Sequence, residues 1–405
     1  MILDVKLCEE LHPAGRIQIS DEVLASHGEI LSPQEPVRLV YAASHVVMLE
    51  SYSGIPHSVA DPGSPEEIEA HIDWSATMAL RSNLAAKGFA IAEAMDTAQR
   101  FRIGWPSARR LIEECGRLSL PTGFVAGAGT DHLAKVAGMA ELIDGVLFQA
   151  KLIQANGGEV ILLPMLELSR WDVSSDQYVE VYRSIIDQLD GPIYVHWLGE
   201  MFLPELAGYF PGDSFERVMS LDPSKVRGAK ISLLDSVREV AIRRALRGSD
   251  QIVLTGDDFH FSSLIAGGEH AAACADGVTT IGSRRVPFGD FSHALLGIFD
   301  AISSPASLAL QRLAQGDVEG YFHLMAPAEA LSRVVFEPPT TYYKSGLAFL
   351  SWLNGAQSNP MLVNHEQTMR ASSYYVRIAD LASKAGAIKD AGIAAERLRD
   401  FLELS

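Results

Sequence analysis

A lysine inside an apolar strand is the residue of this chain with the clearest capacity for chemistry. The run VRGAKIS at 226–232 has strand character and holds Lys230 between Ala229 and Ile231. Burial disfavours the ammonium form, so such a lysine shifts toward a neutral amine, which can attack a carbonyl carbon and form a Schiff base. The structural alternative is a lysine that reaches solvent past its apolar neighbours or pairs with a carboxylate.

A histidine lies in a second apolar run, PIYVHWLG at 192–199. An ionisable group within a buried strand has to be paired or functional. His196 titrates near neutrality and can therefore act as a general acid and base. The two strands together supply an amine for an imine and a group that moves protons.

These two residues belong to a regular alternation of strands and helices. From residue 37 onward, short runs rich in β-branched and aromatic residues alternate with segments of helical periodicity. The predicted strands cover 37–43, 88–94, 122–126, 159–164, 192–197, 227–232, 251–255 and 276–281. Their even spacing, mostly roughly 25 to 35 residues with a helix after each strand, favours a closed parallel (β/α)8 barrel, the TIM barrel, over an open sheet.

Two further segments flank the predicted barrel, which occupies residues 37–302. Residues 1–36 are punctuated by proline and contain the alternating run RIQIS, so they are expected to form a small β extension. Beyond residue 302 the strand signal stops while helical periodicity continues. Residues 303–405 are therefore expected to form a C-terminal helical segment.

Polar residues are frequent where the predicted strands end, which is where a parallel barrel forms its active site. Such loop residues are also often helix caps or solvated side chains. They are His45, Glu93, Asp96, Asp131, His132, Glu167, Ser232, Asp257, Asp258, His260, Arg284 and Arg285. The two arginines follow the expected eighth strand and are candidates for binding a carboxylate or phosphate.

The composition narrows the class of protein. The 405 residues include 33 Lys plus Arg against 51 Asp plus Glu, a net charge of −18 that disfavours nucleic acid and anionic membranes as partners. Cys8, Cys115 and Cys274 lack CxxC or Cys/His spacing, so neither disulfides nor a thiolate metal site is predicted. No secretory signal or membrane-spanning run is evident, and we expect a cytoplasmic protein. Dinucleotide-binding and P-loop fingerprints are absent, and no cofactor is predicted.

The order of several motifs resembles the dihydrodipicolinate synthase and N-acetylneuraminate lyase family, whose members are Schiff-base TIM barrels. The motifs are PIYVHWLG at 192–199, GAKIS at 228–232, VLTGDD at 253–258, GVTTIGSRRVP at 277–287, GFVAGAG at 123–129, GGEVILLPMLELS at 157–169 and YYKSGLAFLSWLNG at 342–355. The resemblance covers residues 37–355. It implies that Lys230 is the Schiff-base lysine. The position of the family's proton-relaying tyrosine, counted from Pro192, is His196, and Tyr194 takes that place if the register differs.

Two departures from the family pattern bear on the substrate. The family's carboxylate-binding turn reads AEAMDT here, from Ala92 to Thr97, and an acidic loop repels a carboxylate. The arginine that some members carry after the tyrosine is replaced by Glu200 or Met201. Both changes argue against pyruvate and lysine biosynthesis, and favour a polyol-like substrate that donates hydrogen bonds to carboxylates.

The sequence therefore predicts a lyase, an aldolase or dehydratase of carbohydrate metabolism, that acts on a small sugar-derived carbonyl compound or keto acid through an imine at Lys230. The expected catalytic residues are Lys230, His196 and Tyr194. The expected substrate-binding residues are Glu93, Asp96, Thr97, Ser232, Asp257, Asp258 and Arg284. By the habit of the family, we expect a homo-oligomer, either a dimer or a tetramer.

Two alternatives stay open. In the first, Glu93, His196, Asp257 and His260 provide oxygen and imidazole ligands for a divalent metal in a barrel aldolase or isomerase, and Lys230 polarises a carbonyl. The spacing of these residues matches no known ligand motif, so no metal is assigned. In the second, the barrel is catalytically silent and binds a sugar or a protein partner.

Overall fold

A computed structural model describes residues 1–26, 28, 37–95, 99–268 and 275–404 of the chain. Contacts within the chain group it into two compact units, one made of Met1–Gln34, Ala42–Phe89 and Gly297–Ser405, the other of Glu35–Tyr41 and Ala90–Leu296. The division into 1–36, 37–302 and 303–405 stays a prediction. In the part of the chain that the structure covers, no helix is both long and apolar enough to cross a membrane.

The second unit is built on a closed barrel. In the described residues, eight parallel strands close in the order β12-β3-β4-β5-β6-β7-β8-β9, with helices alternating along the chain, and this confirms the predicted (β/α)8 fold. The strands are β3 (Val40–Ala42), β4 (Ala90–Glu93), β5 (Phe124–Ala128), β6 (Glu159–Leu162), β7 (Ile193–Leu198), β8 (Val226–Ser232), β9 (Ile252–Thr255) and β12 (His293–Leu296). Residues of β7 are buried throughout, as is typical of strands with a packed interior on one face and helices on the other.

The expected eighth strand is wrong. The run GVTTI forms β10 (Gly277–Ile281), which pairs antiparallel with β11 (Arg284–Phe288) in a separate hairpin. Gly282 adopts φ +59° in the tight turn between them, a conformation that favours glycine. The strand that closes the barrel is β12, whose sequence HALL carries little β-propensity.

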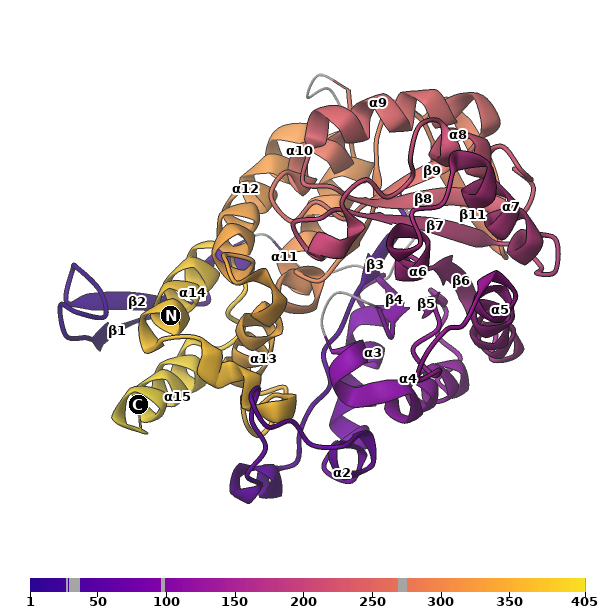
Figure 1. Cartoon of the computed structure of the whole chain (residues 1–405). Helices are drawn as coiled ribbons and strands as arrows, with labels where there is room; N and C mark the ends of the chain where they lie inside the picture. Colours follow the sequence, from indigo (N-terminus) through magenta and orange to yellow (C-terminus); the bar gives the residue numbers. More distant parts are fainter. Residues whose placement is uncertain (27, 29–36, 96–98, 269–274, 405) are drawn as a thin grey trace. The chain divides into compact units, whose positions relative to one another are not determined.

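The helices of this unit follow their strands in chain order. They are α4 (Arg100–Arg117), α5 (Met139–Ala155), α6 (Leu166–Arg170), α7 (Ser175–Ile186), α8 (Ser214–Met219), α9 (Ser236–Leu246) and α10 (Phe261–Ala266). Capping residues fix where two of these helices begin. Ser174 and Gln177 form a capping box on α7, and Asp235 accepts a hydrogen bond from the Arg238 amide at the start of α9. Helix α9 packs beside β9, as Figure 1 shows.

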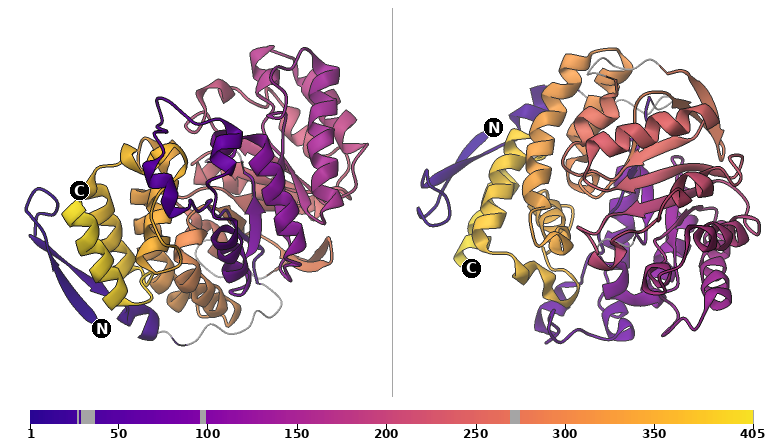
Figure 2. Two further views of the ribbon diagram at one scale, coloured as in Figure 1. Left: turned by 90° about the horizontal axis from the view of Figure 1, so that it is seen from below. Right: turned by 45° about the horizontal axis from the view of Figure 1, so that its top comes forward.

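The other unit contains a hairpin and a group of helices. The run RIQIS forms β2 (Arg16–Ser20), which pairs with β1 (Ile2–Lys6), as the alternation predicted. The helices are α1 (Glu22–Ser26), α2 (Pro65–Glu69), α3 (Trp74–Ala85), α11 (Phe299–Ala314), α12 (Val318–Val335), α13 (Lys344–Leu353), α14 (Ser372–Lys384) and α15 (Ala391–Leu404). The hairpin packs on α14 and α15, which both views of Figure 2 show as yellow helices beside the indigo strands.

Candidate active site

Lys230 lies on the interior face of the barrel. Strands β3 and β7 stand opposite each other in the strand order, and their Tyr41 and Tyr194 hydroxyls meet at 3.3 Å, so both side chains point inward. His196 is two residues beyond Tyr194 and therefore shares its face. In the parallel ladder His196 pairs with Lys230, which places Lys230 on the same interior face. Only 5% of Lys230 is exposed.

His196 and Ser232 accompany Lys230 near the carboxyl ends of the strands. The imidazole Nε2 of His196 lies 3.1 Å from the Ser232 hydroxyl oxygen, and both residues are buried. Ser232 ends β8, two residues after Lys230 and on the same face. An amine, an imidazole and a hydroxyl thus gather in the layer where TIM barrels hold their catalytic groups.

Gly256, directly after β9, leaves space for the Lys230 and Ser232 side chains because it has no side chain of its own. A Cβ atom at this position would lie 2.1 Å from the Ser232 hydroxyl, 3.0 Å from the Ile231 carbonyl oxygen and 3.1 Å from Lys230 Cε. A side chain at residue 256 would therefore displace the lysine or the serine. Gly256 belongs to the VLTGDD motif, and nothing in the sequence marks it for this role.

Tyr194 lies one layer toward the amino ends of the strands. Its hydroxyl approaches that of Tyr41 and the Glu159 carboxylate, 3.5 Å away. Burial, reinforced by the negative charge of Glu159, raises the pKa of Tyr194 well above its usual range. The structure groups His196, and not Tyr194, with Lys230.

Arg284 belongs to that lower layer and not to the mouth of the barrel. Its guanidinium pairs with Glu159, donates to the Tyr41 hydroxyl at 2.7 Å and donates to the Thr122 carbonyl at 2.9 Å. Thr122 precedes β5 and Glu159 begins β6, so this is the amino end of the strands. The structure thus places Arg284 away from the carboxyl ends of the strands, because its segment is a hairpin whose arginine reaches the amino end of the barrel. Its expected role in substrate binding stays a prediction.

Glu93 is buried on the other face of its strand. The ladder aligns Ala92 with Val125 and Val125 with Glu159, and Glu159 contacts the interior tyrosines. Since side chains alternate along a strand, Glu93 points away from the interior, where its Oε1 accepts the Ala94 amide at 3.0 Å. The structure does not bring Glu93 together with Lys230. Asp96 and Thr97 lie outside the described residues.

Asp257 is used to build the turn after β9. Its Oδ1 accepts the backbone amides of Phe259 and His260 at 2.8 and 3.1 Å. Its Oδ2 lies 2.9 Å from Nδ1 of His260, whose side chain is 39% exposed. A buried carboxylate thus orients a half-exposed imidazole at the barrel rim, while Asp258 follows as a buried neighbour.

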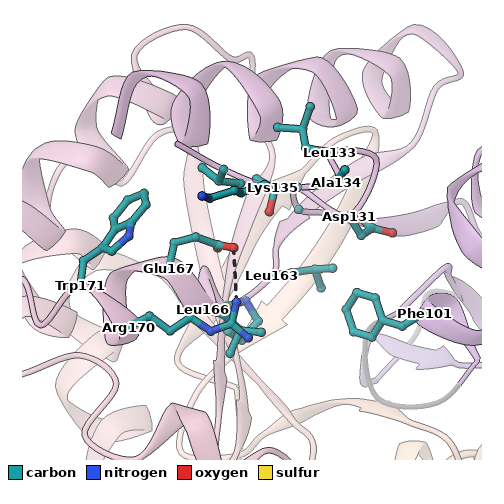
Figure 3. A pocket seen from close by; sticks show the side chains of 14 residues that line it. Phe101, Asp131, Leu133, Ala134, Lys135, Leu163, Leu166, Glu167, Arg170 and Trp171 are labelled. Carbon is teal, nitrogen blue, oxygen red and sulfur yellow. Dashed lines mark ion pairs between the residues drawn. The ribbon is translucent and has the colours of Figure 1, made fainter. Parts of the chain in front are cut away.

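A pocket of about 460 Å³ opens between the loops after β5 and β6, within the size range of small-molecule sites. Figure 3 shows Trp171 at one end and Phe101 at the other, with Lys135, Glu167 and Arg170 between them. Leu163, which lines the pocket, also lies against Gly127 in the barrel interior, so the pocket borders the carboxyl end of the barrel. Glu167 appeared among the strand-end residues, but Lys135 and Trp171 had no motif to mark them.

Asp131, at the edge of this pocket, is committed to a structural pair. Arg100 donates to both of its carboxylate oxygens, at 3.0 and 2.9 Å, and also to the carbonyls of Ala94 and Gly127. Burial alone would raise the pKa of Asp131, but the Arg100 charge outweighs it and the pKa is lowered. Arg100 thereby joins the loops that follow β4 and β5.

The divalent-metal alternative finds no ligand cluster in the described ranges. There, no three His, Cys, Asp or Glu side chains are grouped so that they could hold a metal ion. His196 and Glu93 point to different faces of the barrel wall, and Asp257 is occupied by His260.

A similar fold occurs in solved structures named as dihydrodipicolinate synthases and N-acetylneuraminate lyases. The chain is similar to a protein assigned as a dihydrodipicolinate synthetase from Pseudomonas aeruginosa, with 12% identity, 86% of this chain and 99% of that chain covered, and a TM-score of 0.60. Dihydrodipicolinate synthase from Acinetobacter baumannii, complexed with pyruvate, matches at 14% identity, 87% and 100% coverage and a TM-score of 0.56. N-acetylneuraminate lyase from Mycoplasma synoviae matches at 10% identity, with 86% of this chain and 98% of that chain covered and a TM-score of 0.54.

At the level of sequence, the model of the DUF993 family, described as "Protein of unknown function", matches residues 13–405. No curated protein matches the chain. The resemblance to the dihydrodipicolinate synthase and N-acetylneuraminate lyase family is thus confirmed at the level of the fold, at identities of 10 to 14%.

Proposed function

We propose, since this chain belongs to the DUF993 family of proteins of unknown function, that it is a lyase that forms a Schiff base between Lys230 and a small carbonyl substrate. The observation that carries the proposal is the position of Lys230, a buried lysine on the interior face of a parallel barrel, paired in the ladder with His196. The solved structures with this barrel include enzymes named as lyases or synthases, which supports the class of reaction.

The chemistry follows from these side chains. The Lys230 amine attacks the carbonyl carbon and a water molecule leaves, which gives an iminium. In a C–C cleavage the iminium accepts the electron pair of the breaking bond; in a dehydration it accepts the pair of an adjacent C–H bond as the proton is removed, and the enamine then expels a hydroxyl group as water. Hydrolysis of the imine releases the product and restores the lysine. His196 moves the protons that this sequence requires, with the Ser232 hydroxyl 3.1 Å away as the next group along the path.

The pocket beside the barrel mouth supports a sugar-derived carbonyl compound or keto acid as the substrate. Trp171 offers an apolar face, whereas Lys135, Arg170 and Glu167 offer donors and an acceptor for hydroxyl or carboxylate groups. Glu167 and Arg170 are only 3.9 Å apart, a loose pair that can open to a ligand. In this proposal the carbonyl end of the substrate reaches Lys230 and the polar tail occupies the pocket.

Borohydride trapping tests the proposal. The protein is reduced in the presence of small ketoses, aldoses and 2-keto acids, and tryptic peptides are analysed by mass spectrometry. We expect a reduced adduct on Lys230 with at least one carbonyl compound, and none in Lys230→Met. Lys151→Met, which changes an exposed lysine of α5, should keep the adduct. A wild-type protein that gives no Lys230 adduct across the panel would overturn the assignment.

A further inference from the structure

A second cavity lies in the unit that contains the C-terminal helices. It is formed by the last turns of α3 with Lys87 just after them, the first turns of α11, the end of α13 with the residues that follow it, and Lys389. Its volume is about 40 Å³, roughly three times what one water molecule needs. The space therefore fits a small ion or the terminal group of a larger ligand, and no sugar ring.

Two lysines converge on this cavity without a carboxylate partner. Lys87 donates from its ammonium group to the Ser303 hydroxyl at 2.7 Å. Lys389 is held by its backbone amide, which donates to Asn354 Oδ1 at 2.8 Å. In the described part of the chain, neither ammonium group forms an ion pair within 4.0 Å. The two lysines thus line the same small cavity, Lys87 partly buried and Lys389 more exposed.

The pKa values of both lysines are lowered in this cavity. Burial, and then the nearby charge of Lys389, lower the pKa of Lys87 to about 8. Partial burial also lowers the pKa of Lys389. Each ammonium group would be stabilised by an anion between them.

Asp300 is the carboxylate in the cavity wall, but both of its oxygens are already hydrogen-bonded. It accepts from the Ser44 hydroxyl at 3.0 Å and from His45 Nδ1 at 2.6 Å. The other ring nitrogen of His45 lies 2.6 Å from Gln357 Oε1, and the amide nitrogen of Gln357 donates to the Asn359 carbonyl. Both ring nitrogens of His45 are therefore engaged, and the Asp300 carboxylate is held by Ser44 and His45. Positive charge remains at the two lysines.

The cavity also presents hydroxyl groups. Ser351 Oγ is buried and has no hydrogen-bond partner among the residues that the structure covers. Ser303 accepts from Lys87 and still has its own hydroxyl hydrogen to donate. A buried hydroxyl without a partner is rare in native proteins and indicates a ligand or ordered water at that place.

We propose that Lys87, Lys389, Ser303 and Ser351 form a binding site for a small tetrahedral oxyanion, either free phosphate or sulfate or the phosphoryl group at the end of a larger molecule. The two ammonium groups supply charge-assisted hydrogen bonds, and the two hydroxyls complete the coordination. The site belongs to a different unit from Lys230 and does not depend on the proposed Schiff-base activity.

Titration calorimetry with inorganic phosphate at pH 7 tests the site in the full-length protein. Lys87→Met and Lys389→Met should each weaken phosphate binding by about tenfold or more, because each removes one charge-assisted contact. Lys384→Met makes the same change in net charge at an exposed lysine paired with Asp380, and should stay within about twofold of wild type. Raising the pH to 9 should weaken phosphate binding by the wild-type protein, because the pKa of Lys87 is about 8 and its ammonium group loses its proton above that pH.

Three further binding measurements separate loss of the site from other effects. Lys87→Arg retains the charge and should retain binding, which separates loss of the site from loss of the fold. Acetate should bind more weakly than phosphate and sulfate. A phosphorylated sugar that competes with phosphate identifies a phosphoryl group as the natural occupant. The site would be refuted if Lys87→Met and Lys389→Met bind phosphate as tightly as the Lys384→Met control. It would also be refuted if roughly 10 mM phosphate gives neither heat nor a thermal shift with the wild-type protein.

Discussion

His196 is the residue whose role the geometry separates most clearly from that of a neighbour. It shares a layer with Lys230, whereas Tyr194 is bound to Tyr41 one layer below. We expect His196→Asn to lower turnover by about 10²- to 10⁴-fold, the usual contribution of general acid–base catalysis, while the borohydride adduct on Lys230 still forms. Turnover and adduct yield are measured on the same preparation.

Tyr194→Phe is the matched comparison. It removes one hydroxyl from the lower layer and should cost stability of about 1 kcal/mol with turnover nearly intact. If Tyr194→Phe loses as much turnover as His196→Asn, the proton relay has been assigned to the wrong residue.

Gly256 permits a second test at this scale. In Gly256→Ala, the new methyl group meets the Ser232 hydroxyl and Lys230 Cε, so the lysine should leave its position and adduct formation should fall at least about tenfold. Gly248→Ala, where a Cβ meets nothing within 4 Å, is the control. Normal trapping in Gly256→Ala would show that Lys230 has more freedom than the structure indicates.

The sequence marks Lys230 as a candidate, because a cationic residue inside an apolar strand differs from all its neighbours. The structure shows it buried on the interior face, and its catalytic role stays a prediction. The sequence could not separate Glu93 from the site, since the face to which a strand-end residue points depends on a register that only pairing defines. Lys135 and Trp171 lie on loops without a motif, and only the fold brings them together in one pocket.

Among the elements, the barrel strands up to β9 were predicted within a few residues, because buried parallel strands read as apolar β-branched runs. The last strand was not. GVTTI is rich in β-branched residues and therefore reads as a strand, but the structure uses it in a hairpin with Val278 at the surface. HALL in β12 contains residues that favour helices. Its strand conformation is imposed by the neighbouring strands β9 and β3, between which it lies.

The contact between α9 and β9 carries a pH-dependent group. Glu239 of α9 accepts hydrogen bonds from Thr255 and Ser292 at 2.9 and 2.7 Å. Burial, reinforced by the charge of Asp257, raises the pKa of Glu239 to about 8, against 4.5 for its ordinary value. Its folded form therefore holds the proton more tightly, and the stability that it contributes is complete below pH 4.5 and lost as the pH rises through about 8.

Glu239→Gln should remove this dependence. Urea unfolding at several pH values between 5 and 8 should show wild type losing stability relative to the variant by up to about 1.4 kcal/mol per pH unit. Glu396→Gln, an exposed change on α15, should run parallel to wild type. A difference between wild type and Glu239→Gln that is constant with pH would contradict the raised pKa.

For the whole molecule, a homo-oligomer remains the expectation. Aromatic side chains gather on the outer face of α4 and α5, where Phe101 and Phe148 are 56% and 50% exposed and Trp105 lies 6.2 Å from Phe148 between ring centroids. Exposed apolar groups in one place are typical of protein–protein contacts.

Light scattering at micromolar concentration should therefore report a dimer or tetramer, and Phe148→Glu should shift it toward the monomer. Val237→Glu, a substitution at another exposed apolar residue, is the control and should leave the mass unchanged. A wild-type monomer would contradict the expectation.

The seam that closes the barrel has a consequence for how the chain is made. Leu39 exchanges hydrogen bonds with His293 and Ala294, and Arg38 donates to the carbonyls of Ile265 and Ala266. Ribosomes release the amino-terminal end first, so β3 must wait for more than half of the polypeptide before its partner β12 exists. Closure is thus a late, long-range event in folding, and an interrupted product that ends before residue 293 would expose an unpaired β3 edge on which chaperones or aggregation can act.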